Sequence, residues 1–125
     1  MKVSVDKIRN FAVAGHTSGG KTTLCDLMLF KAKAVDRLGS VDNKTSVSDY
    51  TPDEQEKLSS IYATALNCPW NGHHFFFLDT PGYGEFIGET IAAVHSSDAV
   101  LIVVDGVTGL EVGTSKAWTL AKDRN

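Results

Sequence analysis

The chain has 125 residues, with 12 Lys and Arg against 15 Asp and Glu, so its formal net charge is −3, and 42% of its residues are hydrophobic. This composition is typical of one globular domain and excludes a disordered chain, which would carry fewer apolar residues and more net charge. The longest apolar run, residues 99–104, is far shorter than the ~20 residues that a membrane helix needs.

Three further features indicate where the protein works. No apolar segment of a secretory signal follows the N-terminus, so we predict a cytoplasmic protein with no membrane partner. Cys25 and Cys68 have no partner at metal-ligand spacing and are predicted to be reduced thiols. The mildly acidic balance argues against direct DNA binding.

Strand-like and helix-like segments alternate from the N-terminus onward. An apolar strand at residues 8–14 leads through a glycine-rich loop into a helix at 22–34, where apolar residues recur at helical spacing. The polar stretch 35–58 is predicted to be a mobile loop, because connections of this length are often functional or disordered. A strand at 60–67 follows.

The second half of the chain begins with a predicted hairpin. Asn71-Gly72, a dipeptide favoured in two-residue hairpins, separates 60–67 from a strand at 73–79, so these two strands are expected to pair antiparallel. A helix over 85–95, a strand at 99–104 and a helix over 110–122 complete a β-α-β-β-α-β-α order. This order predicts an α/β fold with a mostly parallel sheet and one antiparallel hairpin strand.

The strand at 99–104 is apolar enough to be buried on both faces and paired on both edges. The sequence offers it a single neighbour. We therefore expect residues 1–125 to be the N-terminal part of one larger domain.

Residues 15–22 match the phosphate-binding pattern G-x-x-x-x-G-K-[ST] in full, between a predicted strand and a predicted helix. In such a P-loop, backbone N–H groups and the helix N-terminus converge on phosphate oxygens. Lys21 is expected to contact the β- and γ-phosphates, and the Thr22 hydroxyl is expected to be a ligand of Mg²⁺. The residues predicted to bind the nucleotide here are Gly15, His16, Thr17, Ser18, Gly19, Gly20, Lys21, Thr22 and Thr23.

A second phosphate-side motif, D-x-x-G, begins where the strand at 73–79 ends. Its Asp79 carboxylate is expected to face the metal, usually through water, and the Gly82 N–H to reach a γ-phosphate. The motif is weak by itself and specific beside a P-loop, because an α/β sheet brings the two strand ends together. Loss of the γ-phosphate would release both Gly82 and the long loop. The residues predicted to bind the nucleotide here are Asp79, Thr80, Pro81, Gly82 and Tyr83.

With these motifs the chain resembles the GTPase domain of translation elongation factor G and its relatives. The resemblance is carried by GHTSGGKTTL, FFFLDTPGYGEF and DAVLIVVDGVTGLEVGT and runs along nearly the whole chain. It implies a P-loop NTPase fold, binding of GTP and GDP with Mg²⁺, hydrolysis stimulated by the ribosome, and further domains downstream. The family reads guanine with Asn-Lys-x-Asp on a strand that would follow residue 125, so guanine preference rests on the resemblance.

Three positions depart from the family pattern. Where the family has a metal-binding threonine in Arg-Gly-Ile-Thr, this chain has Ser60, which keeps a hydroxyl; Thr22, Ser60 and Asp79 are the predicted metal site. Tyr83 replaces the histidine that positions the attacking water in the family. With the loop VSDYTPDE, this substitution makes the chain similar to the elongation factor G-like paralogues of bacteria. Ser18 and Gly19 replace the family's usual Asp-Ala or Asp-His.

The predicted catalytic residues are Lys21 and Tyr83. A phenol with a pKa of about 10 orients water but accepts a proton poorly at neutral pH. Three functions therefore stay open: a GTPase of the elongation factor G type, a nucleotide-dependent binding switch with little hydrolysis, and a P-loop ATPase or kinase of another family. The first two differ in turnover, whereas the third differs in base preference.

Overall fold

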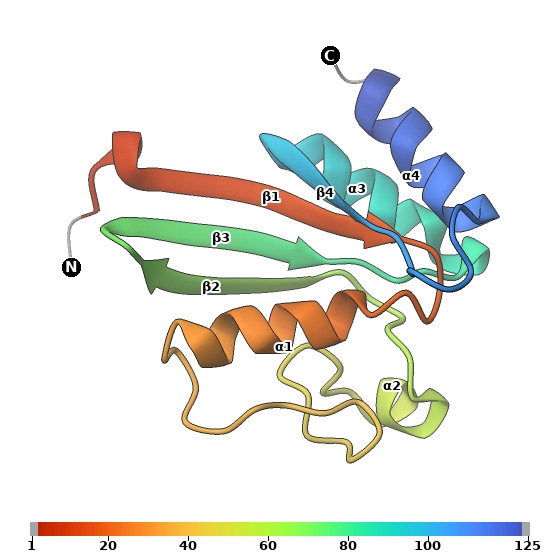
Figure 1. Cartoon of the computed structure of the whole chain (residues 1–125), viewed down its shortest axis with the longest axis horizontal. Coiled ribbons are helices and arrows are strands. Elements are labelled where there is room, and N and C mark those ends of the chain that lie inside the picture. The colour runs from red at the N-terminus through yellow and green to blue at the C-terminus, as the bar shows by residue number, and fades with distance from the viewer. Residues whose placement is uncertain (1–2, 124–125) are drawn as a thin grey trace.

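The computed structural model of the chain describes residues 3–123 (Figure 1), so the ends of the predicted domain, 1–2 and 124–125, lie outside the described residues. In chain order the elements are η1 (Val5–Lys7), β1 (Ile8–Gly15), α1 (Lys21–Lys31), α2 (Pro52–Lys57), β2 (Thr64–Trp70), β3 (His73–Asp79), η2 (Gly84–Phe86), α3 (Ile87–Ser96), β4 (Ala99–Val103) and α4 (Val112–Asp123). The strands form one sheet in the order β2-β3-β1-β4.

The sheet is mostly parallel, as predicted. β1 pairs parallel with β3 and with β4, whereas β2 and β3 are antiparallel. Asn71 and Gly72 join β2 to β3 with φ angles of 47° and 76°, the positive values that a tight hairpin turn requires. The predicted α/β fold class and the hairpin are both confirmed.

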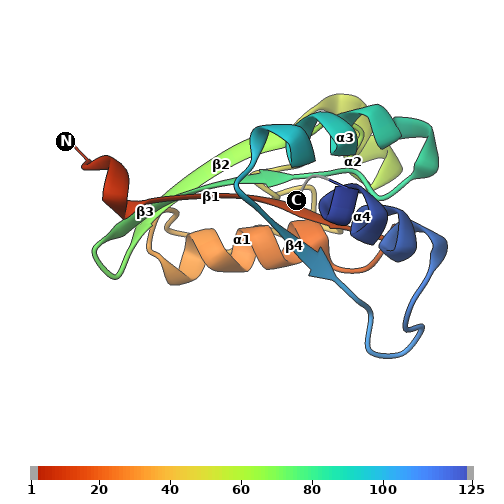
Figure 2. The same cartoon turned by 90° about the horizontal axis from the view of Figure 1, so that it is seen from above.

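Helices cover both faces of the sheet: α1 lies on one face, and α3 and α4 lie on the other (Figure 2). Successive residues of a strand point to opposite faces, so the neighbours Ala12 and Val13 of β1 serve different cores. Val13 packs with Leu29 of α1 and Phe77 of β3, whereas Ala12 packs with α3. These two layers hold β1 and its C-terminal loop in place.

The strand predicted at 60–67 begins later, at Thr64, and that prediction was wrong at its start. The N–H groups of Ile61 and Tyr62 donate to Glu54 Oε1, at 3.1 and 3.2 Å, and the Ala63 N–H donates to Glu89 Oε2 at 2.8 Å. Carboxylates thus take the backbone donors that a strand would give to its neighbour.

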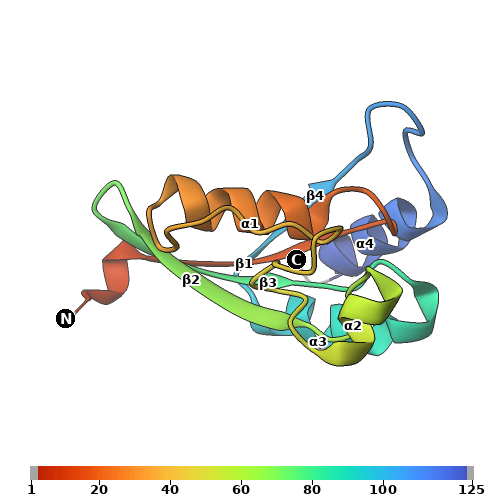
Figure 3. The ribbon, with the colours of Figure 1, turned by 90° about the horizontal axis from the view of Figure 1, so that it is seen from below.

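The polar stretch predicted as one loop contains the short helix α2. Thr51 caps it: the Thr51 side chain accepts from the Glu54 N–H, and Glu54 in turn accepts from the Thr51 N–H. Figures 1 and 3 show the loop that precedes α2 running alongside α1, and Figure 1 shows α2 beyond the end where α1 begins. Thr-Pro-Asp-Glu, a capping box with proline at the first helical position, is the sequence signal for this helix. The mobility of the loop stays a prediction.

β4 lies at the edge of the sheet with β1 as its neighbour among the described residues, and its Leu101 side chain is 41% exposed. That this strand is covered and paired on its second edge in a larger domain stays a prediction. α1 ends at Lys31 instead of residue 34, because Lys33 adopts a left-handed φ of 55°.

Cys25 and Cys68 are free thiols, as predicted, and both are buried. Burial raises the pKa of both thiols, which keeps them protonated. Within residues 3–123, no helix is both long enough and apolar enough to cross a membrane.

Candidate nucleotide and metal site

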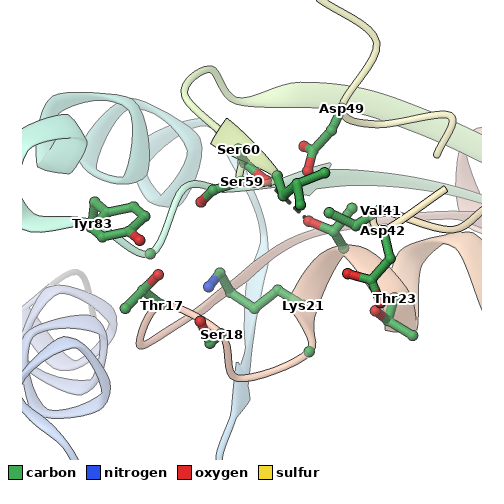
Figure 4. A pocket seen from close by; sticks show the side chains of 14 residues that line it. Thr17, Ser18, Lys21, Thr23, Val41, Asp42, Asp49, Ser59, Ser60 and Tyr83 are labelled. Carbon is green, nitrogen blue, oxygen red and sulfur yellow. Dashed lines mark hydrogen bonds between the residues drawn. The ribbon is translucent and has the colours of Figure 1, made fainter. Parts of the chain in front are cut away.

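The candidate site lies where β1 and β3 end. Val13 of β1 is in register with Asp79 of β3, so the loops that leave these strands start side by side. Between them is a pocket of about 230 Å³, lined on a third side by Ser59 and Ser60, which follow α2 in the sequence (Figure 4). It is lined by Thr17, Ser18, Gly20, Lys21, Thr22, Thr23, Val41, Asp42, Asp49, Leu58, Ser59, Ser60, Gly82 and Tyr83.

Lys21 supplies the positive charge of the pocket. Its side chain is 6% exposed, and its ammonium donates to the backbone oxygen of His16 at 2.7 Å. Burial lowers the Lys21 pKa, and the nearby Asp79 carboxylate opposes this. Lys21 also opens α1, whose first N–H groups have no partner within the helix. An ammonium and a helix N-terminus at one place favour an anion.

Thr22 and Ser60 come together from segments 38 residues apart. Their hydroxyl oxygens are 3.0 Å apart and both side chains are buried. Octahedral Mg²⁺ holds its ligands at about 2.1 Å, which places neighbouring ligands about 3.0 Å from each other. The two hydroxyls are hydrogen-bonded to each other in this structure, and the same 3.0 Å separation would also suit two neighbouring ligands of one magnesium ion.

Asp79 lies behind these hydroxyls at the end of β3, fully buried. Its Oδ2 accepts from the Ser48 hydroxyl at 2.6 Å, and its Oδ1 has no partner among the described residues. Burial raises the Asp79 pKa, and the hydroxyls of Ser48 and Thr22 oppose this rise. An unpaired buried carboxylate oxygen costs free energy unless a cation or a bound water satisfies it.

Asp49 is a site residue that the sequence analysis did not single out. It is 3% exposed, lines the pocket, and neither of its oxygens has a partner among the described residues. Burial raises its pKa to about 6, against the lowering effect of the nearby Ser60 hydroxyl. The sequence shows only an aspartate in a polar loop, so no local pattern distinguished it from its exposed neighbours.

Gly82 brings the D-x-x-G segment against the P-loop. A Cβ atom built on it would lie 2.5 Å from both N and Cα of Thr17, a distance that only glycine permits. Tyr83 follows, 45% exposed, and its ring faces Thr17 across the pocket (Figure 4). A phenol at this place is open to water.

Other predicted residues lie outside the lining of this pocket. The Thr80 hydroxyl donates to the Val13 backbone oxygen at 2.8 Å, and the Pro81 backbone oxygen accepts from Thr90 at 3.1 Å. The His16 ring points to α4, where its Nδ1 accepts from the Gly113 N–H. The structure thus brings Lys21, Thr22, Ser60 and Gly82 to one pocket. The side chains of Thr80 and His16 instead make hydrogen bonds to β1 and α4. Gly15 and Gly19 do not line the pocket either.

The donor set around the pocket suits Mg²⁺. This ion prefers oxygen ligands and usually binds through one or two protein groups, several waters and substrate phosphates. Two hydroxyls at ligand spacing and the unpaired oxygens of Asp49 and Asp79 supply such a set. In residues 3–123 no three His, Cys, Asp or Glu side chains are grouped as a metal site of their own.

Comparison with known proteins identifies the family. Residues 6–125 match the family described as the elongation factor Tu GTP binding domain. The chain belongs to this family. It is 35% identical over 124 residues to the mitochondrial ribosome-releasing factor 2 of Scheffersomyces stipitis and 39% identical over 115 residues to that of Drosophila ananassae. The alignments cover 99% and 92% of this chain but only 15% and 16% of the relatives.

Solved structures agree with this assignment. A protein from Thermus thermophilus superposes with a TM-score of 0.91 at 39% identity, over 94% of this chain and 18% of that one. A bacterial selenocysteine-specific elongation factor superposes with a TM-score of 0.70 at 27% identity, over 90% of this chain and 17% of the other. The predicted relationship to translational GTPases of the elongation factor G type is confirmed, and so is their G-domain fold.

Proposed function

We propose that this chain forms the phosphate- and metal-binding part of a translational GTPase that binds GTP and GDP with Mg²⁺ and acts on the ribosome. The observation that carries the proposal is the 3.0 Å approach of the Thr22 and Ser60 hydroxyls beside the buried Lys21 and Asp79. Four groups from three segments that meet around one pocket fit a phosphate and its cation better than any separate structural role.

Each side chain has a distinct task in this proposal. Lys21 holds the β- and γ-phosphates, Thr22 and Ser60 ligate the ion, and Asp79 and Asp49 hold its water ligands. Bound Mg²⁺ would neutralise charge that develops on the phosphates. The Gly82 N–H faces the γ-phosphate, which couples the nucleotide state to the segments that carry Gly82 and Ser60.

Tyr83 decides between two versions of this function. In the enzyme version its phenol orients a water molecule toward the γ-phosphate; it does not take the proton, because a phenol is a weak base at neutral pH. In the alternative version the protein is a nucleotide-dependent binding switch with little intrinsic hydrolysis. The observation that favours this alternative is the phenol itself at the position that the resemblance assigns to a histidine.

The partner proposed here is the ribosome, because the similar proteins are named ribosome-releasing factors or elongation factors. Those relatives from Scheffersomyces and Drosophila are called mitochondrial, and a cytoplasmic location for this protein stays a prediction. The absence of DNA binding also stays a prediction.

The test is a binding and turnover assay on the full-length protein, since the chain spans about 15% of the length of its relatives. GTP and ATP are compared with and without Mg²⁺ and with and without ribosomes of the same organism. Ribosome-stimulated GTP hydrolysis supports the enzyme, and a Tyr83→Phe variant then shows whether the hydroxyl contributes. Tight GTP binding without stimulated hydrolysis supports the switch, whereas preference for ATP refutes both versions.

A further inference from the structure

His16 belongs to the P-loop, yet its side chain is directed at a different element. The Nδ1 atom accepts from the backbone N–H of Gly113, in the first turn of α4, at 3.2 Å. Because Nδ1 accepts a hydrogen bond, the proton of the neutral ring is on Nε2. The Nε2 atom lies 3.6 Å from the Glu111 carboxylate. Both ring nitrogens thus face groups at the start of α4.

The approach of α4 to His16 is close enough to require glycine. A Cβ atom at Gly113 would lie 2.6 Å from His16 Cα and 2.8 Å from its Nδ1. Any side chain at position 113 would force α4 and the P-loop apart. Glycine within a helix costs about 1 kcal/mol relative to alanine, so this contact has a stability cost.

The backbone of His16 makes the link to the phosphate site. Its carbonyl oxygen accepts from the Lys21 ammonium at 2.7 Å, the one hydrogen bond of this ammonium among the described residues. One residue therefore contacts α4 through its ring and the Lys21 charge through its carbonyl. We therefore expect a displacement of the ring to move the carbonyl oxygen that holds the Lys21 ammonium.

We propose that His16 is a positioning residue, which transmits the placement of α4 to Lys21 and so sets the affinity of the site for the nucleotide phosphates. The inference rests on the proposed phosphate role of Lys21. It assigns an influence on phosphate binding to Glu111 and Gly113, at the start of α4, neither of which lines the nucleotide pocket.

The first test measures the affinity of the full-length protein for the fluorescent nucleotide mant-GTP. His16→Leu keeps the bulk of the ring but removes the acceptor, and we expect about a fivefold loss of affinity, since one hydrogen bond contributes about 1 kcal/mol. His16→Asn retains an acceptor for the Gly113 N–H and is expected to bind within twofold of wild type. Equal affinities for wild type and His16→Leu, or equal losses for both variants, would overturn the proposal.

The second test approaches from α4 and avoids the P-loop. Gly113→Ala is expected to lower mant-GTP affinity at least fivefold. Hydrogen exchange should show unchanged amide protection outside α4, which excludes global destabilisation as the cause. The matched control is Gly106→Ala, in the connection between β4 and α4, where a Cβ atom meets nothing within 4 Å. If Gly113→Ala binds as tightly as Gly106→Ala, α4 does not set phosphate affinity.

The link to Lys21 is tested by combining His16→Leu with Lys21→Arg. If His16 acts through Lys21, the two losses in affinity are less than additive, because each disturbs the same contact. Fully additive losses show that His16 does not act through Lys21. Failure of the wild-type protein to bind mant-GTP would instead refute the proposed function, which keeps the two failures distinct.

Discussion

Glu54 is the residue whose replacement tests most directly how the site is assembled. Its side chain is 1% exposed, and its two oxygens accept four hydrogen bonds. Oε2 accepts from the N–H and the hydroxyl of Thr51, at 3.3 and 2.7 Å, and Oε1 accepts from the N–H groups of Ile61 and Tyr62. Glu54 therefore joins the start of α2 to the residues that follow Ser60.

The expected effect of Glu54→Gln follows from this count. One oxygen becomes an NH₂ group, so two of the four donors lose their acceptor. Hydrogen bonds to a charged group contribute about 1.5 kcal/mol or more each, which gives a loss of about 3 kcal/mol for the closed segment. A change of this size shifts an open–closed equilibrium about 150-fold.

Hydrogen exchange measured on peptides that cover residues 51–62 checks this expectation. In Glu54→Gln the amides of Ile61 and Tyr62 should exchange much faster, while the amides of β1 keep their protection. Glu56→Gln is the matched control, since Glu56 is an exposed carboxylate in the same helix. Unchanged exchange at 61–62 would refute the reasoning, and an equal loss of protection in β1 would show global destabilisation instead.

Three further predictions concern charge, packing and close approach. The Asp49 carboxyl has a pKa near 3.8 in the unfolded chain and about 6 in the folded protein, so the folded state binds the proton more tightly and stability falls as pH rises from about 4 to 6. The full shift corresponds to about 3 kcal/mol, which solvent screening reduces to about 1.5 kcal/mol. Urea unfolding of the nucleotide-free protein should show this fall in stability, and the Asp49→Asn variant should not. Phe77→Ala should lower the free energy of unfolding by about 3–5 kcal/mol because Phe77 is 1% exposed, whereas the half-exposed neighbour Phe76→Ala should cost less than about 1 kcal/mol in the same urea titration. Gly82→Ala should weaken mant-GTP binding at least tenfold, because the added Cβ atom would lie 2.5 Å from the P-loop backbone. The control Gly88→Ala, where a Cβ atom meets nothing within 4 Å, should bind as the wild type does. Equal affinities for the two variants would show that the close approach of Gly82 to the P-loop does not matter for binding.

Much of the site could be predicted from sequence because its chemistry lies in short continuous motifs. The P-loop and D-x-x-G each lie directly after a β-strand, and parallel strands place such ends at one edge of the sheet. Lys21, Thr22, Gly82 and Tyr83 were therefore predicted to lie together, and all four line one pocket. Ser60 was predicted from the family resemblance, and its hydroxyl lies 3.0 Å from that of Thr22.

The segment between α1 and β2 could not be predicted in the same way. Its course depends on contacts with residues far away in the sequence: the Val47 N–H donates to Asp26 of α1, and Ser48 donates to Asp79 of β3. Polar residues in a long loop show no periodicity that would indicate which of them become buried. Asp49 and the helix α2 were missed for this reason, although the capping box of α2 was readable.

The sequence by itself determined the order of the four strands and of the helices α1, α3 and α4, the hairpin at Asn71-Gly72 and the phosphate-binding motifs, because each depends on near neighbours along the chain. Only the tertiary structure decided which of the predicted residues face the pocket. The His16 ring packs against Gly113, the Thr80 hydroxyl donates to β1, and Asp49 becomes buried with no partner for either oxygen among residues 3–123. These outcomes depend on how segments far apart in the sequence pack together and on which polar groups find partners where they meet. The spacing of residues within a short motif does not determine either of these.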